Sequence, residues 1–196
     1  ENIVNVAKKY ITLNSSVLDV GSNFGQMAIL FSNLTGDGGK VYAFDAADFV
    51  FEILTKNIAA NDKKNVVATF GAVHNVPDTY LFFPEPDFSK YGTYGSFGID
   101  YKNSLGRKVP TITIDGLNIQ EKISFMKVDV QGGDLYAMQG AVKTIAKNKM
   151  PIVFEYECSV EDELPITFQD YVDFVNHINY KFVKVIELSL GVLGFW

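Results

Sequence analysis

Two acidic residues and a glycine turn are spaced as in a pocket for an adenosine-bearing molecule. The stretch at 17–28 reads VLDVGSNFGQMA, in which an apolar run passes through Asp19 into a turn bounded by Gly21 and Gly25. A second apolar run, VYAF, ends at Asp45, about 20 residues beyond the turn. A carboxylate at this spacing can accept hydrogen bonds from both hydroxyls of a ribose. Glycines kept only for packing are the alternative, but two acids at the ends of consecutive strands favour a cofactor.

The turn favours S-adenosylmethionine over a dinucleotide as that cofactor. A dinucleotide site has the pattern G-x-G-x-x-G, whereas this turn reads GSNFG, with Asn23 in place of the middle glycine. The negative charge of Asp19 would repel a pyrophosphate but attract an ammonium or a sulfonium group. We expect the cofactor to contact the turn and the residues around the strand ends, namely Asp19, Gly21, Ser22, Asn23, Phe24, Gly25, Asp45, Ala46, Gly71, Ala72 and Asp129.

Three side chains could remove a proton from a hydroxyl group that accepts a methyl group. Asp129 is the first candidate, and it could act as the general base or instead hold the ammonium group of the cofactor. Glu155 ends a later apolar run, where a carboxylate is as often a cap for a helix or loop. His74 closely follows the run at 66–70, although a histidine in a loop is more often solvated. All three are therefore candidate catalytic residues.

A divalent cation such as Mg²⁺ offers another way to acidify a hydroxyl group. Asp129, Asp134 and Glu155 carry oxygen ligands of the kind that Mg²⁺ prefers. No compact group of carboxylates in the sequence requires a metal ion, so the sequence allows a metal but does not indicate one.

The elements that must position these residues alternate between strand and helix. Apolar runs predict strands at 17–20, 41–44, 66–70, 123–130, 152–156 and 182–186, with a last edge strand at 190–196. Helical spacing predicts helices at 3–10, 24–33, 49–60, 135–147 and 168–178. This order predicts an α/β protein with a doubly wound, mostly parallel sheet of six or seven strands and helices on both faces. Ligands of such sheets bind beyond the carboxyl ends of the strands, where Asp19, Asp45, Gly71, Asp129 and Glu155 lie.

Residues 73–122 interrupt the alternation of strands and helices. They contain the apolar segment at 80–83, the alternating segment at 111–115 and the tract YGTYGSFG at 91–98. We expect short strands and a loop whose aromatic rings stack on a substrate as a lid. Long loops in compact domains are usually functional or disordered, so a disordered surface loop is the alternative.

The bulk composition limits the size, the partners and the location of the protein. The 196 residues are 47% hydrophobic and carry a net charge of −6, which suits a single domain at 1–196. Lys and Arg form no runs, which disfavours nucleic acid as a partner. A single cysteine, no signal peptide and no apolar run of about 18 residues predict a cytoplasmic protein that is not bound to a membrane. Because the chain begins at Glu1, we also expect that it can be part of a longer polypeptide with further catalytic domains.

Several tracts together carry a resemblance to a known family. Besides the turn at 17–28 and VYAFD at 41–45, the chain contains FMKVDVQGGDL at 125–135, QGA at 139–141 and PIVFE at 151–155. From about residue 3 to 186 the chain resembles the FkbM-type S-adenosylmethionine-dependent methyltransferases, whose late tract reads K-I-D-V-E-G-x-E, then L-x-G-A and P-x-I-x-x-E. The resemblance implies a Rossmann-like methyltransferase fold and O-methylation of a sugar, glycan or related natural product. Gln131 and Asp134 stand where the family has two glutamates, which weakens any transfer of their roles.

Two other functions compete with an O-methyltransferase that acts on a small-molecule or glycan acceptor. A methyltransferase for nucleic acid or protein is disfavoured by the acidic composition and by the lack of a basic tract. A non-catalytic module that binds adenosine compounds is kept open by Gln131, which replaces a carboxylate of the family pattern.

Overall fold

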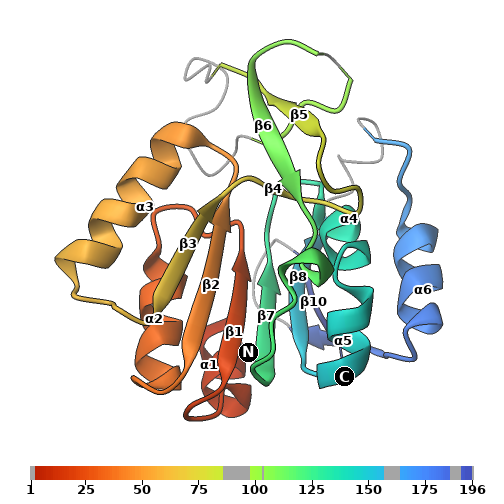
Figure 1. Ribbon diagram of the computed structural model, residues 1–196. Coiled ribbons are helices and arrows are strands. Elements are labelled where there is room, and N and C mark those ends of the chain that lie inside the picture. The colour runs from red at the N-terminus through yellow and green to blue at the C-terminus, as the bar shows by residue number, and fades with distance from the viewer. Residues whose placement is uncertain (1–2, 86–97, 103, 157–163, 186–190, 196) are drawn as a thin grey trace.

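The described residues of the computed structural model form a seven-stranded sheet at the centre of the molecule (Figure 1). They comprise 3–85, 98–102, 104–156, 164–185 and 191–195. In chain order the elements are α1 (Ile3–Tyr10), β1 (Ser16–Val20), α2 (Gln26–Thr35), β2 (Lys40–Asp45), α3 (Asp48–Ala60), β3 (Val66–Phe70), β4 (Ala72–Val73), β5 (Tyr80–Phe83), β6 (Arg107–Ile112), the 3₁₀ turn η2 (Asp115–Leu117), β7 (Ile123–Val128), α4 (Asp134–Gln139), α5 (Val142–Asn148), β8 (Ile152–Tyr156), α6 (Phe168–His177), β9 (Phe182–Val185) and β10 (Gly191–Phe195).

The sheet has the strand order β3-β2-β1-β7-β8-β10-β9. Within the described chain, the strands from β3 to β8 form a continuous parallel sheet of five strands, and β10 and β9 bring the whole sheet, expected to be mostly parallel with six or seven strands, to seven. The segment expected to be an edge strand, β10, instead lies between β8 and β9 and is antiparallel to both. The five residues 186–190 that join β9 to β10 are too few for the crossover that a parallel neighbour requires. The α/β doubly wound class is confirmed.

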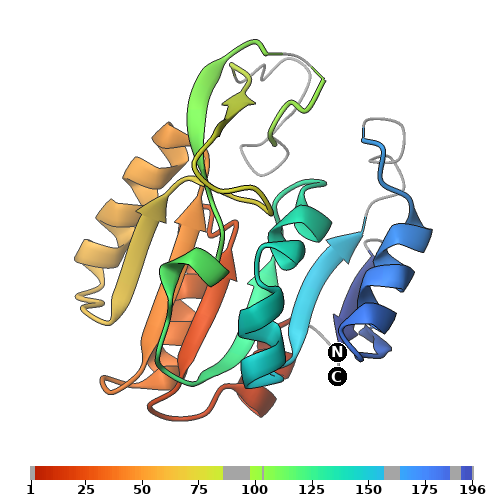
Figure 2. The ribbon, with the colours of Figure 1, turned by 45° about the vertical axis from the view of Figure 1, so that its right-hand side comes forward.

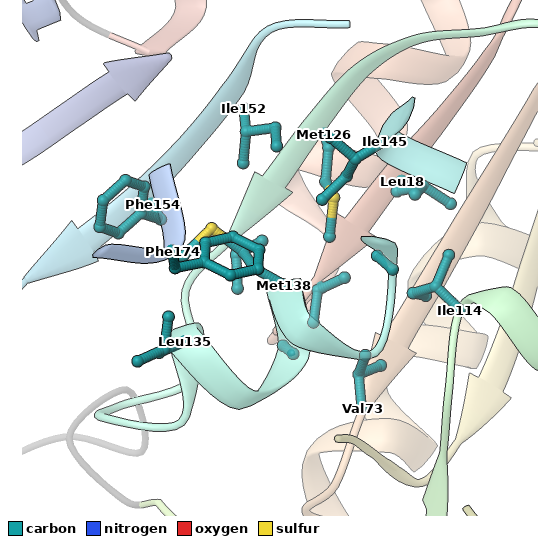
Figure 3. Close-up of a cluster of buried hydrophobic side chains, with 14 of the residues drawn as sticks. Leu18, Val73, Ile114, Met126, Leu135, Met138, Ile145, Ile152, Phe154 and Phe174 are labelled. Atoms are coloured by element: carbon teal, nitrogen blue, oxygen red, sulfur yellow. The ribbon is translucent and has the colours of Figure 1, made fainter. Parts of the chain in front are cut away.

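Helices cover both faces of the sheet (Figure 2). Alternation along β1 directs Val17 towards α1, α2 and α3, and Leu18 towards α4, α5 and α6. Figure 3 shows the cluster on the second face, in which side chains of the sheet meet those of the helices; it includes Leu18, Met126, Ile152, Leu135, Met138, Ile145 and Phe174. Burial on both faces explains why the central strands are almost continuously apolar.

The interruption at 73–122 forms a second, smaller sheet with the order β4-β6-β5 among its described residues. This sheet lies beyond the carboxyl ends of the central strands (Figure 1). The short strands that the sequence predicted are therefore present, and β4 follows β3 directly through Gly71, which has a φ of +154°. Most of the glycine–aromatic tract at 91–98 falls outside the described residues, so the proposed lid stays a prediction.

The helix expected at 135–147 is broken into α4 and α5 at Gly140. A Cβ at Gly140 would lie 2.1 Å from the carbonyl oxygen of His74, so the close approach of these two segments requires a glycine. The carboxylate of Asp115 then accepts hydrogen bonds from the backbone N–H groups of Lys143 and Thr144 and caps the first turn of α5. Among the described residues no helix combines the length and apolarity that a membrane span requires. The cellular location stays a prediction.

Candidate active site

A cavity of about 520 Å³ opens at the carboxyl ends of β1, β2 and β7. The chain proceeds from β1 to β2 and β3 on one side, and from β7 to β8 on the other, so the strand order reverses between β1 and β7. Doubly wound sheets bind ligands at this switch point, and the volume is that of a small-molecule site. Most of the predicted site residues line the cavity: Gly21, Ser22, Asn23, Phe24, Asp45, Ala46, Gly71, Ala72, Asp129 and Glu155.

The glycine turn after β1 is held against the ends of β2 and β7. The backbone N–H groups of Gly21 and Ser22 both donate to the carbonyl oxygen of Phe44, at 3.0 and 2.8 Å. Gly21 has a φ of +77°, and a Cβ there would lie 1.8 Å from the carbonyl oxygen of Asp129. A side chain at Gly21 is thus excluded by the protein itself, before any ligand is considered.

Left-handed backbone conformations shape the rest of the turn. Asn23 has a φ of 50°, and its side-chain oxygen accepts a hydrogen bond of 2.7 Å from the N–H of Phe24. Asparagine tolerates this conformation better than most residues because its short polar side chain can bond locally. Gly25 has a φ of +88° and precedes α2, so this helix begins at Gln26 rather than at Phe24 as expected. Gly25 does not line the cavity, and its contact with a cofactor stays a prediction.

The carboxylate of Asp45 is oriented by two backbone donors. One oxygen, Oδ2, accepts a hydrogen bond of 2.8 Å from Asn23, and Oδ1 accepts one of 2.9 Å from Ala47. Burial raises the pKa of Asp45 to about 6, while these two hydrogen bonds act in the opposite direction. Each oxygen retains lone-pair capacity that can accept a ribose hydroxyl, so this residue fits the role that its spacing predicted.

Asp19 lies beneath the cavity rather than in its wall. It pairs with Lys127 in the register of β1 and β7, and the Lys127 Nζ atom is 3.5 Å from Asp19 Oδ1. Burial raises the pKa of the Asp19 carboxyl, and the charge of Lys127 opposes this effect. The same ammonium group lies 3.4 Å from Asp129 Oδ2 and donates to the carbonyl oxygen of Gly21 at 2.7 Å. Direct contact between Asp19 and the cofactor stays a prediction, because Lys127 intervenes on the cavity side.

Three carboxyl groups meet at the ends of β7 and β8. Asp129 has 42% of its side chain exposed and lines the cavity together with Glu155. Asp134 is buried behind them and accepts hydrogen bonds from the backbone N–H groups of Val130 and Glu155, at 3.5 and 3.4 Å. Burial, and then the charges of Asp129 and Glu155, raise the pKa of Asp134 to about 7. Among the described residues, no three His, Cys, Asp or Glu side chains are arranged to hold a metal ion.

His74 does not line the cavity. Its ring centroid is 4.8 Å from that of Tyr136 and 6.3 Å from that of Tyr101, and its Nδ1 atom accepts a hydrogen bond from Val76 N–H at 3.2 Å. Burial lowers the pKa of His74. Tyr101, which packs on this histidine, lines the cavity in its stead. A catalytic role for His74 stays a prediction.

The sequence did not assign several residues that line the cavity. Lys127 carries a signal that could have been used, because it is a lysine inside an apolar strand two residues before Asp129. Phe83, Ile99 and Tyr101 come from the inserted segment, and no spacing rule predicts where such a segment returns to the sheet.

Solved structures with the same fold include proteins described as methyltransferases. An FkbM methyltransferase of Methylobacillus flagellatus KT matches with a TM-score of 0.62 and 15% identity over 93% of this chain, which spans 43% of that protein. A Streptococcus mutans protein described as a methyltransferase, solved in complex with SAH, matches with a TM-score of 0.58 and 13% identity over 98% of this chain and 93% of that one. A Clostridium thermocellum protein described as an rRNA methylase matches with a TM-score of 0.59 and 11% identity over 98% of this chain and 91% of that one. These likenesses show the fold, which is the Rossmann-like methyltransferase fold.

A match to a family model assigns the chain to a family, which the shared fold alone does not. No curated protein sequence matches the chain. The methyltransferase FkbM domain matches residues 19–182, a stretch that includes the glycine turn, Asp45, Asp129 and Glu155. The chain therefore belongs to the FkbM methyltransferase family and is an S-adenosylmethionine-dependent methyltransferase.

Proposed function

We propose that the protein transfers a methyl group from S-adenosylmethionine to a hydroxyl group of a sugar, a glycan or a related natural product. The observation that carries this proposal is the position of Asp129. Its carboxylate is partly exposed in the cavity and lies at the switch point, directly beside the glycine turn. A base at this position can reach an acceptor that approaches the methionine end of the cofactor.

Some of the cavity residues bind the cofactor, and others act on the acceptor. The bound cofactor supplies an electrophilic methyl group on its sulfonium. Asp45 and the glycine turn hold the adenosine part, and Asp129 accepts the proton of the acceptor hydroxyl as general base. Lys127 lies beside Asp129 Oδ2, which leaves Oδ1 for the acceptor. Glu155 is the alternative base in the same wall. Holding the hydroxyl oxygen in line with the methyl group contributes a further large share of the rate.

The acceptor side of the cavity supports a small hydroxylated substrate. Phe83 and Ile99 cluster with Ala46 and Ala47 beside Asp45, whereas Tyr101 packs on Tyr136 of α4 and offers an aromatic ring on which the C–H groups of a sugar can pack. The net charge of −6 and the lack of Lys or Arg runs disfavour RNA or DNA, whose phosphates require a basic surface. The rRNA methylase among the structural neighbours shares only the fold, so it does not outweigh this argument.

A label-transfer experiment tests the proposal. The protein is incubated with S-adenosylmethionine labelled in its methyl group and with separate pools of sugars and glycans, polyhydroxylated natural products, RNA and protein. We expect label only in the hydroxylated compounds, as methyl ethers identified by mass spectrometry. Label in RNA or protein alone would overturn the acceptor class. Tight cofactor binding without transfer to any pool would favour the non-catalytic module, and an Asp45→Asn variant serves as the control for cofactor-dependent transfer.

A further inference from the structure

We propose that Lys127 binds the carboxylate of the methionine end of the cofactor and so determines which way that end lies in the cavity. The proposal concerns the cofactor and is independent of the acceptor proposed above. It gives a function to a buried lysine that the sequence pattern left without one.

Lys127 is the only basic residue that lines the cavity in the described part of the chain. The same walls contain three carboxylates, those of Asp45, Asp129 and Glu155. A cofactor that ends in both an ammonium and a carboxylate group therefore finds several anionic partners for its ammonium group, but a single cationic partner for its carboxylate. A carboxylate left without a partner in this acidic site would be repelled by its neighbours.

The ammonium group of Lys127 is fixed before any ligand binds. It donates to the carbonyl oxygen of Gly21 at 2.7 Å and lies between the carboxylates of Asp19 and Asp129, at 3.5 and 3.4 Å. Burial alone would lower the pKa of Lys127, but the two carboxylates outweigh this and keep it above its ordinary value. A charged, immobile cation loses little freedom when it binds an anion.

The topology places Lys127 at the end of the cofactor opposite to the ribose. Asp45 ends β2, the glycine turn follows β1, and Lys127 lies on β7, so the three follow one another across adjacent strands. A cofactor with its ribose on Asp45 extends over the turn and brings its amino-acid end to β7. Because the charge of Lys127 repels an ammonium group, the carboxylate of the cofactor turns to Lys127 and its ammonium to Glu155, which leaves Asp129 Oδ1 for the acceptor.

A purely structural role is the alternative, in which Lys127 only compensates the buried charge of Asp19. The test must therefore remove the lysine without leaving that carboxylate unpaired, which would destabilise the fold. The double variant Asp19→Asn/Lys127→Met achieves this with side chains of similar size, and Asp19→Asn alone is the matched control. Circular dichroism confirms that each variant is folded.

Calorimetry with two probes separates the two roles. S-Adenosylhomocysteine carries the amino-acid end, and methylthioadenosine lacks it. We expect the double variant to bind S-adenosylhomocysteine about 10-fold to 100-fold more weakly than Asp19→Asn does, as for the loss of a charged hydrogen bond. Its affinity for methylthioadenosine should change by less than about 2-fold, since that probe does not reach Lys127. Equal losses for both probes, or no loss for either, would overturn the proposal.

A second measurement needs no variant and decides the case if the double variant does not fold. The wild-type protein is titrated with S-adenosylhomocysteine and with its decarboxylated analogue, which keeps the amine. We expect the decarboxylated analogue to bind at least about 10-fold more weakly. Equal affinities would show that no cation binds the carboxylate.

Discussion

The backbone N–H of Asn23 donates a 2.8 Å hydrogen bond to Asp45 Oδ2, which joins the glycine turn after β1 to the acid at the end of β2. The two features that the sequence separates by a whole helix thus form one structural unit. A change in the carboxylate of Asp45 will therefore affect the turn as well as the ribose.

Replacing Asp45 with asparagine should weaken S-adenosylhomocysteine binding by about 1.5–3 kcal/mol, the range for hydrogen bonds to a charged group. Asparagine retains one acceptor for the turn, so the loss reports mainly on the charge that receives the ribose hydroxyls. Isothermal titration calorimetry measures the affinity, and Asp62→Asn, at an exposed carboxylate, is the control. An unchanged affinity would remove Asp45 from the cofactor site.

The same carboxyl group gives cofactor binding a pH dependence. The pKa of Asp45 is raised to about 6, so the group takes up a proton as the pH falls through that value. A protonated carboxyl group accepts hydrogen bonds less strongly, and we expect the affinity for S-adenosylhomocysteine to fall between pH 7 and pH 5. In Asp45→Asn this part of the pH dependence should be absent. Calorimetry on both proteins across the range decides the point.

The acids at the strand ends were predictable because parallel strands all present their carboxyl ends at one edge of the sheet. How deeply each acid is buried could not be predicted from the sequence. Asp19 precedes the glycine turn and has the appearance of a ligand, but its strand pairs with β7 so that Lys127 covers it. Pairing between segments more than a hundred residues apart decides this arrangement, and local spacing does not report it. That Tyr101 lines the cavity could not be predicted for the same reason, because its position depends on the path of the inserted segment.

Two glycines of the turn should differ in their tolerance of alanine. In Gly21→Ala the new methyl group would meet a backbone oxygen at 1.8 Å, whereas in Gly25→Ala it would meet the end of the flexible Leu54 side chain at 2.6 Å. Both changes carry the cost of a left-handed conformation, about 1–2 kcal/mol. We expect Gly21→Ala to lose clearly more stability than Gly25→Ala in urea unfolding, and to lose cofactor binding as well. Similar losses in the two variants would show that the end of β7 can move away.

The buried carboxyl group of Asp134 should make the fold less stable as the pH rises. Its pKa is about 7 in the folded protein against an ordinary value of 3.8, so between these values the folded protein holds a proton that the unfolded chain has released. Stability therefore falls with rising pH across this window and levels off above pH 7. The neutral variant Asp134→Asn lacks this term, so its melting temperature should improve relative to wild type from pH 5 to pH 7. A constant difference between the two melting curves would show that Asp134 is ionised throughout.

Asp129→Asn should lower the rate of methyl transfer far more than it lowers cofactor affinity. The change keeps the shape of the side chain and removes its capacity to accept a proton, so the loss of a general base predicts a rate lower by about 10²- to 10⁴-fold. Turnover is measured with the acceptor that label transfer identifies, and affinity with S-adenosylhomocysteine. If Asp129 only binds the ammonium group of the cofactor, affinity and rate should fall together. Glu155→Gln is the matched comparison in the same wall, because the larger rate effect should move to it if Glu155 is the base. Inactivation by EDTA with recovery on addition of Mg²⁺ would instead assign the acidification of the hydroxyl to a metal ion.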